Sequence, residues 1–507
     1  MGCLTNTMKL IMNFLIILLA TLQAVSSLPE CGELDAEVLI LGAGMAGINA
    51  ARTLFDEGMT DFLIIEAKPQ IGGRIFHSEI RPGGAKVELG ANWIQGVDPD
   101  DPEAHPLYEL AQRCGGIQGN FSDFDSIIEY DSTGLQVSDL LDYDGIADAY
   151  ENVEYISTAR QADGQTDITV REALLQSNWT VDSNEDAFLD WFCFDFCFAE
   201  PPDNTSLFHS QPLSTYTDFG NASNTEDFLI SDQSGYAKLV ECIADGILGI
   251  NNSRLLLETK VNIIKWSDDC VCVETYRDGV MKEYCASYAI ITFSIGVLQS
   301  EEINMKFEPD LPEWKLDVIN MFSMAHYLKM YAEFPTVFWD DVEFIGYVSD
   351  VRGYFPLFLS ENLFLPDGNN VLQITTTGEI ATRLLLQNEN ETINELVQVL
   401  RSIYGSNVTE PTAFIQSTWY TDPYFLGSYS NIPLGVTNQT FIDLAAPVGR
   451  VYFSGEATSM QYNGFVHGAY FAGRDSAEAV LESISIGVSV VANLLLVMFV
   501  VIFVLLF

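Results

Sequence analysis

The chain has 507 residues, of which 48% are hydrophobic, so it is long and apolar enough to form two or more domains with buried cores. Its 71 acidic residues outnumber its 23 basic residues, which gives a formal net charge of -48 at pH 7. This balance excludes a nucleic-acid partner, because phosphates bind to clusters of Lys and Arg that the sequence lacks. An acidic surface attracts small cations instead, and it equally fits solubility in a secretory environment.

The first 27 residues have the pattern of a secretory signal peptide. Lys9 precedes an apolar run over residues 10–22, and the small residues Ala24, Ser26 and Ser27 follow it. We therefore predict a cleaved signal peptide over residues 1–27 and an extracellular or cell-surface protein. Glycosylation is expected in that pathway at the Asn-x-Ser/Thr sequons, which begin at Asn120, Asn178, Asn204, Asn221, Asn251, Asn390, Asn407 and Asn438.

Eight of the nine cysteines lie beyond the predicted signal peptide. An even number permits disulfide bonds in an oxidising compartment, but their pairing does not follow from the spacing. Cys193 and Cys197 lie four residues apart; they either form a bridge or, as we expect, are buried apolar thiols. The spacing matches no metal-binding motif, so we predict no metal site.

A dinucleotide-binding motif occupies residues 37–67, where the pattern predicts a strand, a glycine turn, a helix and a second strand. "GAGMAG" supplies Gly42, Gly44 and Gly47, with Ala46 inside the motif. The first glycine permits the turn, the second lets the backbone approach a pyrophosphate, and the third lets helix and strand pack closely. Glu66 ends the second strand, where a carboxylate binds ribose hydroxyls.

A second glycine pair and an arginine follow at once, in "KPQIGGRI". Nicotinamide-binding folds do not need them, and here the chain resembles the flavin-containing amine oxidases. Similarity continues through "VELGANWIQG", "FAEPP", "FSIGVLQS", "FEPDLPEWK" and "VYFSGEATSMQYNGFVHGAYFAGRDSAEAVL". The resemblance covers residues 37–481 and is strongest to the plant-type secreted polyamine oxidases.

The resemblance implies FAD as cofactor and assigns residues to it by position. It places Glu66 and Arg74 at the ribose and phosphate end, Val261 at the adenine, Glu456 at the ribityl-pyrophosphate region and Val466 at the flavin pyrimidine. It also predicts FAD contacts for Gly73 and places Gly90, Ala91, Asn92, Trp93 and Trp419 along the flavin ring. Because no cysteine occurs in "GEATSMQYNG", where some members attach the flavin, we predict noncovalent FAD.

A lysine interrupts the apolar strand pattern of "MAHYLKMYAEFP". Alternation puts Lys329 on one face with Tyr327 and Tyr331. An edge strand or a snorkelling side chain explains a lysine here without chemistry. In the resembling family this position faces flavin N5 and is bridged to it by water, so we predict that Lys329 is catalytic.

The substrate pocket is predicted from the same resemblance. Tyr429 and Phe465 match the aromatic pair that sandwiches the amine, and Tyr327 lines the pocket with them. Two acids of the plant-type enzymes are replaced here by Gln95 and Cys197. Burying an ammonium without a carboxylate costs several kcal/mol, so this loss favours a changed substrate unless other acids compensate. The candidates for compensation are Asp195, Glu200 and acids at the rim.

Other patterns predict secondary structure. Residues 120–220 are rich in polar residues and predict helices and loops. Residues 255–293 predict a strand meander with a hairpin at residues 277–279, and residues 392–404 predict an amphipathic helix that ends at Gly405. The uncharged apolar run that ends the chain predicts either a GPI-anchor signal or a membrane span, and hence membrane attachment.

Together these patterns predict an α/β fold with a discontinuous Rossmann-type FAD domain and a substrate domain built from a mixed sheet and helices. The expected FAD-domain parts are residues 35–118, 222–315 and 418–482, the substrate-domain parts are 119–221 and 316–417, and the hydrophobic tail is 483–507. The expected function is an FAD-dependent amine oxidase, most consistent with a polyamine oxidase, that uses O2 and a small cationic amine. Monoamine oxidase, L-amino-acid oxidase and a non-enzymatic FAD-retaining surface protein are the alternatives, and a monomer or weak oligomer is expected.

Overall fold

The computed structural model of the protein describes residues 32–210, 219, 226–300 and 305–506, with only the backbone described for residues 487–506. The predicted signal peptide and the sequon at Asn221 lie outside the described residues, as do most side chains of the predicted tail. Among the described residues, no helix is both long enough and apolar enough to cross a membrane.

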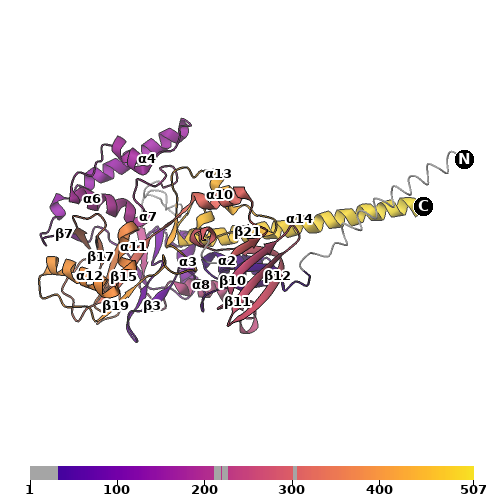
Figure 1. The fold of residues 1–507 in the computed structure, drawn as a ribbon, viewed down its shortest axis with the longest axis horizontal. Helices are drawn as coiled ribbons and strands as arrows, with labels where there is room; N and C mark the ends of the chain where they lie inside the picture. The colour runs from indigo at the N-terminus through magenta and orange to yellow at the C-terminus, as the bar shows by residue number, and fades with distance from the viewer. Residues whose placement is uncertain (1–31, 211–218, 220–225, 301–304, 507) are drawn as a thin grey trace.

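An eight-stranded sheet forms the centre of one of the two lobes of the molecule, which we call the first half although its strands come from the whole length of the chain (Figure 1). Its strands come from three separated stretches of sequence and lie in the order β13-β10-β11-β12-β1-β2-β9, with β21 also paired to β12. β1, β2 and the part of β12 that pairs in parallel with β1 are largely buried on both faces, as expected for a sheet covered by helices on each side. The strands are β1 (Ala36–Leu41), β2 (Phe62–Ile65), β9 (Leu255–Leu256), β10 (Lys260–Trp266), β11 (Val271–Arg277), β12 (Val280–Ile291), β13 (Lys306–Glu308) and β21 (Val451–Phe453).

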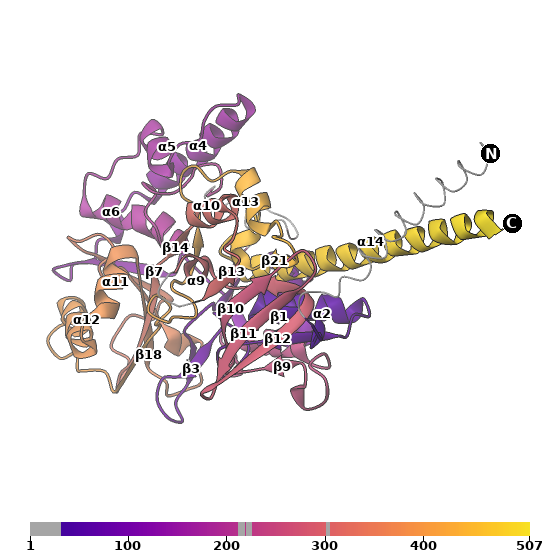
Figure 2. The ribbon, with the colours of Figure 1, turned by 45° about the vertical axis from the view of Figure 1, so that its right-hand side comes forward.

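Helices cover both faces of this sheet. On one face, α14 approaches α2 so closely that a Cβ on Gly473 would lie 2.2 Å from the carbonyl oxygen of Ala46. The C-terminal part of α14 projects away from the body of the molecule in both ribbon views (Figure 2). The helices around this sheet are α2 (Met45–Asp56), α3 (Pro106–Arg113), α8 (Ala237–Ala244), α9 (Ile295–Gln299), α10 (Glu313–Met321), α13 (Asn438–Ala445) and α14 (Val466–Leu506).

A six-stranded mixed sheet, in the order β19-β15-β18-β17-β16-β7, forms the second half. Its apolar side packs against α11 and α12, and the predicted amphipathic helix is confirmed as α12, which ends at Gly405. The members are β7 (Ile127–Asp131), β15 (Tyr327–Glu333), β16 (Phe344–Val348), β17 (Leu357–Leu359), β18 (Val371–Thr377), β19 (Ala413–Gln416), α11 (Gly378–Leu386) and α12 (Glu389–Tyr404).

The polar stretch 120–220 does not consist only of helices and loops, as the sequence predicted. β7 lies within it and pairs in parallel with β16, more than 200 residues further along the chain. The helical part carries its own apolar cluster beside the six-stranded sheet. Its helices are α4 (Tyr143–Ala162), α5 (Val170–Gln176), α6 (Asn184–Asp190) and α7 (Phe196–Phe198), with a π-helical turn, Trp191–Asp195, between the last two.

Three small sheets connect the two halves. The one most relevant to function has the order β5-β8-β6, with β8 antiparallel to both neighbours. The small-sheet strands are β3 (His77–Glu79), β4 (Lys86–Glu88), β5 (Trp93–Val97), β6 (Gly119–Phe121), β8 (Glu226–Ile230), β14 (Ser323–Ala325) and β20 (Tyr429–Asn431). Disulfides join Cys114 to Cys242 and Cys272 to Cys285.

Candidate active site

A cavity of about 790 Å³ extends from the glycine turn after β1 to the middle of β15. This volume lies in the range of small-molecule and cofactor sites. Every predicted site residue except Gly47 lines it. The lining residues from that set are Gly42, Gly44, Ala46, Glu66, Gly73, Arg74, Gly90, Ala91, Asn92, Trp93, Gln95, Cys197, Val261, Tyr327, Lys329, Trp419, Tyr429, Glu456, Phe465 and Val466.

The glycine turn between β1 and α2 packs so closely against its neighbours that no larger residue fits at two of its positions. A Cβ on Gly42, whose φ is 110°, would lie 2.3 Å from Thr292 Oγ1. A Cβ on Gly47 would lie 2.0 Å from the carbonyl oxygen of Gly42, so Gly47 packs the helix against the turn and does not line the cavity. The first turn of α2 has no acidic side chain and no side-chain cap, which suits the binding of an anionic phosphate at its N-terminus.

The acids at this end of the cavity are already engaged. Glu66 accepts hydrogen bonds from the N–H groups of Ala43 (2.7 Å) and Lys68 (2.8 Å), and burial raises its pKa. Glu456 forms a 2.8 Å ion pair with Arg74 and also accepts from the backbone N–H of Ser430 at 3.1 Å. The contact with Ala43 fixes Glu66 beside the glycine turn, and the contacts with Arg74 and Ser430 fix Glu456.

The "GANW" segment lies along the middle of the cavity. A Cβ on Gly90 would lie 1.7 Å from the carbonyl oxygen of Arg74, so only glycine allows this close approach of two backbone segments. The Trp419 Nε1–H donates to the carbonyl oxygen of Leu89 at 2.8 Å, which fixes the indole beside this segment. Asn92 Nδ2 is buried and has no hydrogen-bond partner among the described residues, so it is available to a bound group.

Lys329 is the central cation of the cavity. It lies in β15, is only 5% exposed, and donates from Nζ to the Gly90 carbonyl oxygen at 2.6 Å and to Asn92 Oδ1 at 2.5 Å. Its Nζ also lies 5.5 Å from the ring centroid of Trp93. Burial lowers the pKa of Lys329 to about 7, with Glu88 and Glu361 acting in the opposite direction. The explanations that place this lysine at an edge or with its head in solvent are therefore wrong.

Two buried acids beside Lys329 were missed from the sequence. Glu88 accepts the Tyr236 N–H at 2.6 Å through one oxygen, and its other oxygen has no partner among the described residues. Burial raises the pKa of Glu88 and of Glu361 to about 7. Both line a small cavity of about 10 Å³, close to the size of one water molecule, together with Asn92. Glu88 lies in the "VELGANW" motif, and its position there could have identified it as a site residue. No motif surrounds Glu361, so the sequence does not distinguish it from a surface acid.

Aromatic side chains form the wall around Lys329. The Tyr327 ring centroid lies 6.1 Å from that of Tyr429 and 6.3 Å from that of Phe196. Phe465 stacks on His467 at 5.1 Å, and the Tyr429 hydroxyl donates to the carbonyl oxygen of Cys197 at 2.8 Å. These rings exclude water from the space in front of the lysine.

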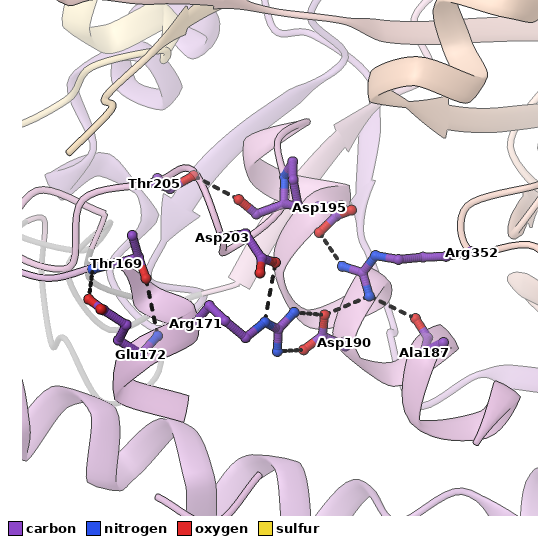
Figure 3. Close-up of polar contacts among 10 residues, drawn as sticks. Thr169, Arg171, Glu172, Ala187, Asp190, Asp195, Asp203, Thr205 and Arg352 are labelled. Carbon is purple, nitrogen blue, oxygen red and sulfur yellow. Dashed lines mark hydrogen bonds and ion pairs between the residues drawn. The ribbon is translucent and has the colours of Figure 1, made fainter. Parts of the chain in front are cut away.

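Cys197 follows the π-helical turn, and an ion-pair network holds this turn in place (Figure 3). Asp190 lies between Arg171 (2.7 Å) and Arg352 (2.6 Å), and Arg352 also pairs with Asp195 at 2.6 Å. Cys193 and Cys197 are free thiols among the described residues, which agrees with the expectation that they do not bridge. The expectation of two buried thiols is wrong by surface exposure, because Cys193 is partly buried and the Cys197 side chain is exposed and lines the cavity. The surrounding protein nevertheless desolvates the Cys197 sulfur.

Asp195 does not compensate for the missing acids. Its carboxylate is bound to Arg352, and neither Asp195 nor Glu200 lines the cavity. The cavity instead receives a carboxylate that was not predicted, Asp227 of β8. No sequence signal marked it, because its place beside Gln95 depends on the pairing of β8 with β5.

Comparison with known proteins places the chain in a family. Residues 45–481 match the family described as flavin containing amine oxidoreductase. The chain is 36% identical over 494 residues to "Polyamine oxidase 1" of Zea mays, covering 93% of this chain and 96% of that protein. It is 37% identical over 479 residues to "Polyamine oxidase 7" of Oryza sativa subsp. japonica, covering 91% and 98%.

Solved structures share the fold at lower sequence identity. Cyclohexylamine oxidase from Brevibacterium oxydans IH-35A has a TM-score of 0.70 at 20% identity, covering 89% of this chain and 100% of that one. Wild-type putrescine oxidase bound to putrescine has a TM-score of 0.69 at 19% identity, covering 89% and 99%. The predicted α/β fold class is thereby confirmed.

Proposed function

Because this chain belongs to the flavin containing amine oxidoreductase family, we propose that it is a polyamine oxidase. Family membership confirms the predicted FAD cofactor and the predicted class of enzyme, an FAD-dependent amine oxidase. The proposal of polyamines as substrates is supported by the names of the plant relatives and by their near-complete coverage of the chain. The single structural observation that carries it is a buried, two-point-anchored lysine in a cavity walled by aromatic rings.

The residues present fit noncovalent FAD. The glycine turn and the open N-terminus of α2 suit its pyrophosphate, and Glu66 lies at the end of β2 where ribose hydroxyls are bound. Asn92 Nδ2 offers a buried donor, and the cavity is large enough for a cofactor of this size. FAD held by these residues would supply a hydride acceptor for the carbon beside the amine nitrogen, and its reoxidation by O2 with two protons would release hydrogen peroxide.

Lys329 is the group that handles a proton. In its neutral form Nζ has two N–H donors and one lone pair, and the carbonyl oxygen of Gly90 and Asn92 Oδ1 accept both donors. The lone pair is then free to accept a hydrogen bond or a proton from water or from the amine. With a pKa of about 7, half of the side chains are neutral near physiological pH, which suits a general base.

The aromatic wall positions the amine and keeps bulk water away. Tyr327, Tyr429 and Phe465 present ring faces and edges to the cavity, which suit the methylene chain of an alkyl amine and attract its cationic end. Water that hydrolyses the imine product releases an aldehyde and, from a secondary amine, a shorter amine.

Two other activities fit parts of the site. Monoamine oxidation is favoured by the neutral residues Gln95 and Cys197. L-Amino-acid oxidation needs a cation for the substrate carboxylate, and the arginine in the cavity lining, Arg74, is paired with Glu456.

Loss of flavin absorbance under anaerobic conditions separates these activities when the purified holoenzyme is mixed with spermine, spermidine, butylamine or an L-amino acid. Bleaching by a polyamine supports the proposal, whereas bleaching only by butylamine or by the amino acid contradicts it.

We further propose that the enzyme acts outside the cell or at its surface and is attached through its C-terminal tail. Two disulfides between described cysteines support an oxidising compartment, and the sequons and both apolar termini support the secretory route. Glycosidase treatment of the secreted protein should raise its gel mobility, and a phospholipase that cleaves GPI anchors should release it from cells. A protein that is found only reduced and unglycosylated would contradict this location.

A further inference from the structure

We propose that Asp227 binds the distant ammonium group of a diamine or polyamine substrate and so replaces the acids that Gln95 and Cys197 do not supply. This inference rests on the proposed amine oxidation and adds a residue that selects the substrate. It predicts a preference for amines that carry a second positive charge over monoamines of the same length.

A β-bulge brings Asp227 to the cavity. The register of β5 and β8 shifts between Ile94 and Val97, so that Gln95 and Gly96 together lie opposite Asp227. Gly96 has a φ of 78°, and its N–H donates to Asp227 Oδ1 at 3.2 Å. Gln95 and Asp227 therefore lie on neighbouring strands, and both line the cavity. The carboxylate that is missing at Gln95 is supplied from the opposite strand.

Among the described residues, Asp227 is the carboxylate of the cavity lining that is held by the fewest contacts. Glu66, Asp227 and Glu456 are the acids of the lining. Glu456 is paired with Arg74, and Glu66 is held by two backbone N–H groups at the glycine turn. Within the described part of the chain the Asp227 carboxylate forms no ion pair, and the one hydrogen bond that it accepts is from the Gly96 N–H. Burial raises its pKa to about 6, which is the shift expected of an acid that lacks a nearby cation.

The neighbouring thiol does not compete for the ammonium. Burial first, and the charge of Asp227 second, raise the pKa of Cys197 to about 12, so the thiol stays neutral at physiological pH. Cys197 thus contributes a small, polarizable wall, and Asp227 contributes the charge.

Strand geometry places Asp227 at a useful distance from the lysine. Leu229 pairs with Trp93, whose ring centroid lies 5.5 Å from Lys329 Nζ, and Asp227 precedes Leu229 by two residues along β8. Two residues of strand span roughly 7 Å. Asp227 is thus displaced along β8 from the residue opposite Trp93 by about the length of a short alkyl chain. This register allows one amine group to lie in front of Lys329 while the other binds to Asp227.

The test compares two amines in three forms of the holoenzyme. Anaerobic stopped-flow flavin reduction gives a Kd and a limiting rate for putrescine and for butylamine, which have equal chain length and differ in one ammonium group. In Asp227→Asn the Kd of putrescine should rise about tenfold or more, with the limiting rate nearly unchanged, while the Kd of butylamine should stay within about twofold. Glu226→Gln is the matched control, because Glu226 is an exposed acid one residue away, and it should alter neither amine.

Each outcome decides something. An unchanged putrescine Kd in Asp227→Asn, or an equal loss for both amines, overturns the role of Asp227. Asp227→Ser is a second neutral variant, and its hydroxyl can still accept a hydrogen bond from the Gly96 N–H. If Asp227→Asn does not retain FAD, Asp227→Ser takes its place, and the same selective rise in the Kd of putrescine is expected. Should the unmodified enzyme be reduced by no amine at all, the proposed function fails, and that result is visible before any variant is compared.

Discussion

At the scale of single residues, Lys329 is the group to which we assign the proton chemistry. Lys329→Met keeps the length and apolar stem of the side chain but removes the lone pair and the contacts with Gly90 and Asn92. Flavin reduction by the amine or reoxidation by O2 should slow by about 100-fold or more, while FAD stays bound, because a positioned base contributes that much. Stopped-flow absorbance measures both half-reactions.

Lys282→Met is the control for that experiment, since Lys282 is an exposed lysine on β12 outside the cavity. It should leave both half-reactions unchanged. Rates in Lys329→Met that equal those of the unmodified enzyme would remove Lys329 from the mechanism.

Glu361 tunes this lysine by its charge. A nearby carboxylate favours the protonated amine, and Glu361 raises the pKa of Lys329 against the larger, opposite effect of burial. In Glu361→Gln the pKa of Lys329 should therefore fall. The ascending limb of the rate of flavin reduction against pH is expected to have its midpoint near the Lys329 pKa of about 7 in the unmodified enzyme, and it should move to lower pH in this variant.

The matched control is Glu379→Gln, which removes an exposed acid at the start of α11. It should leave the pH profile in place. A profile that moves to higher pH in Glu361→Gln would contradict this arrangement of charges.

At the scale of elements, the turn that carries Cys197 depends on buried charge. Asp190 is fully buried and lies between two arginines, so Asp190→Asn leaves both guanidinium groups without their shared counter-charge. Breaking a buried pair in this way costs about 3–5 kcal/mol, and Tm should fall clearly in a thermal denaturation experiment. Asp203→Asn removes a carboxylate that is 57% exposed from the same Arg171, and it should cost at most about 1 kcal/mol. Equal losses in the two variants would show that burial of Asp190 is unimportant.

The type of an element, helix or strand, was predictable where a local motif or a regular spacing of apolar residues is present. The glycine turn between β1 and α2, the hairpin of β11 and β12, and α12 all follow from patterns within about 40 residues, and each is confirmed. β7 was missed because its five residues carry too short a pattern and its pairing partner β16 is distant in sequence. Tertiary pairing decides such short strands.

At the scale of the whole molecule, the sequence led to the cavity but not to all of its charges. Twenty of the residues singled out from motifs line one cavity, because motif residues converge where parallel strands end beside helix α2. The sequence did not identify three buried acids, Asp227, Glu88 and Glu361. Their raised pKa values result from burial by neighbours from distant parts of the chain, and local residue spacing does not predict such burial. Whether the domain boundaries lie where the sequence placed them stays a prediction.

The disulfide between Cys114 and Cys242 encloses the segment that contains β6, β7, the helices α4 to α7 and β8. Cysteine spacing does not reveal such pairing, since eight cysteines allow 105 connectivities. The bond closes a loop of 128 residues between the end of α3 and the middle of α8, whereas Cys272 and Cys285 close one of 13 residues between paired strands. Chain-entropy arguments assign about 5 kcal/mol to the long loop and about 3 kcal/mol to the short one.

We therefore expect Cys114→Ser with Cys242→Ser to lower Tm more than Cys272→Ser with Cys285→Ser. The reason is that the first pair restrains the unfolded positions of β6, β7 and the helices α4 to α7, while the hairpin of β11 and β12 keeps its backbone hydrogen bonds without its bridge. Thermal denaturation followed by flavin fluorescence compares the two double variants at equal FAD content. A larger loss from the hairpin pair would mean that strain or packing in the folded hairpin, and not restraint of the unfolded chain, determines what these bonds contribute.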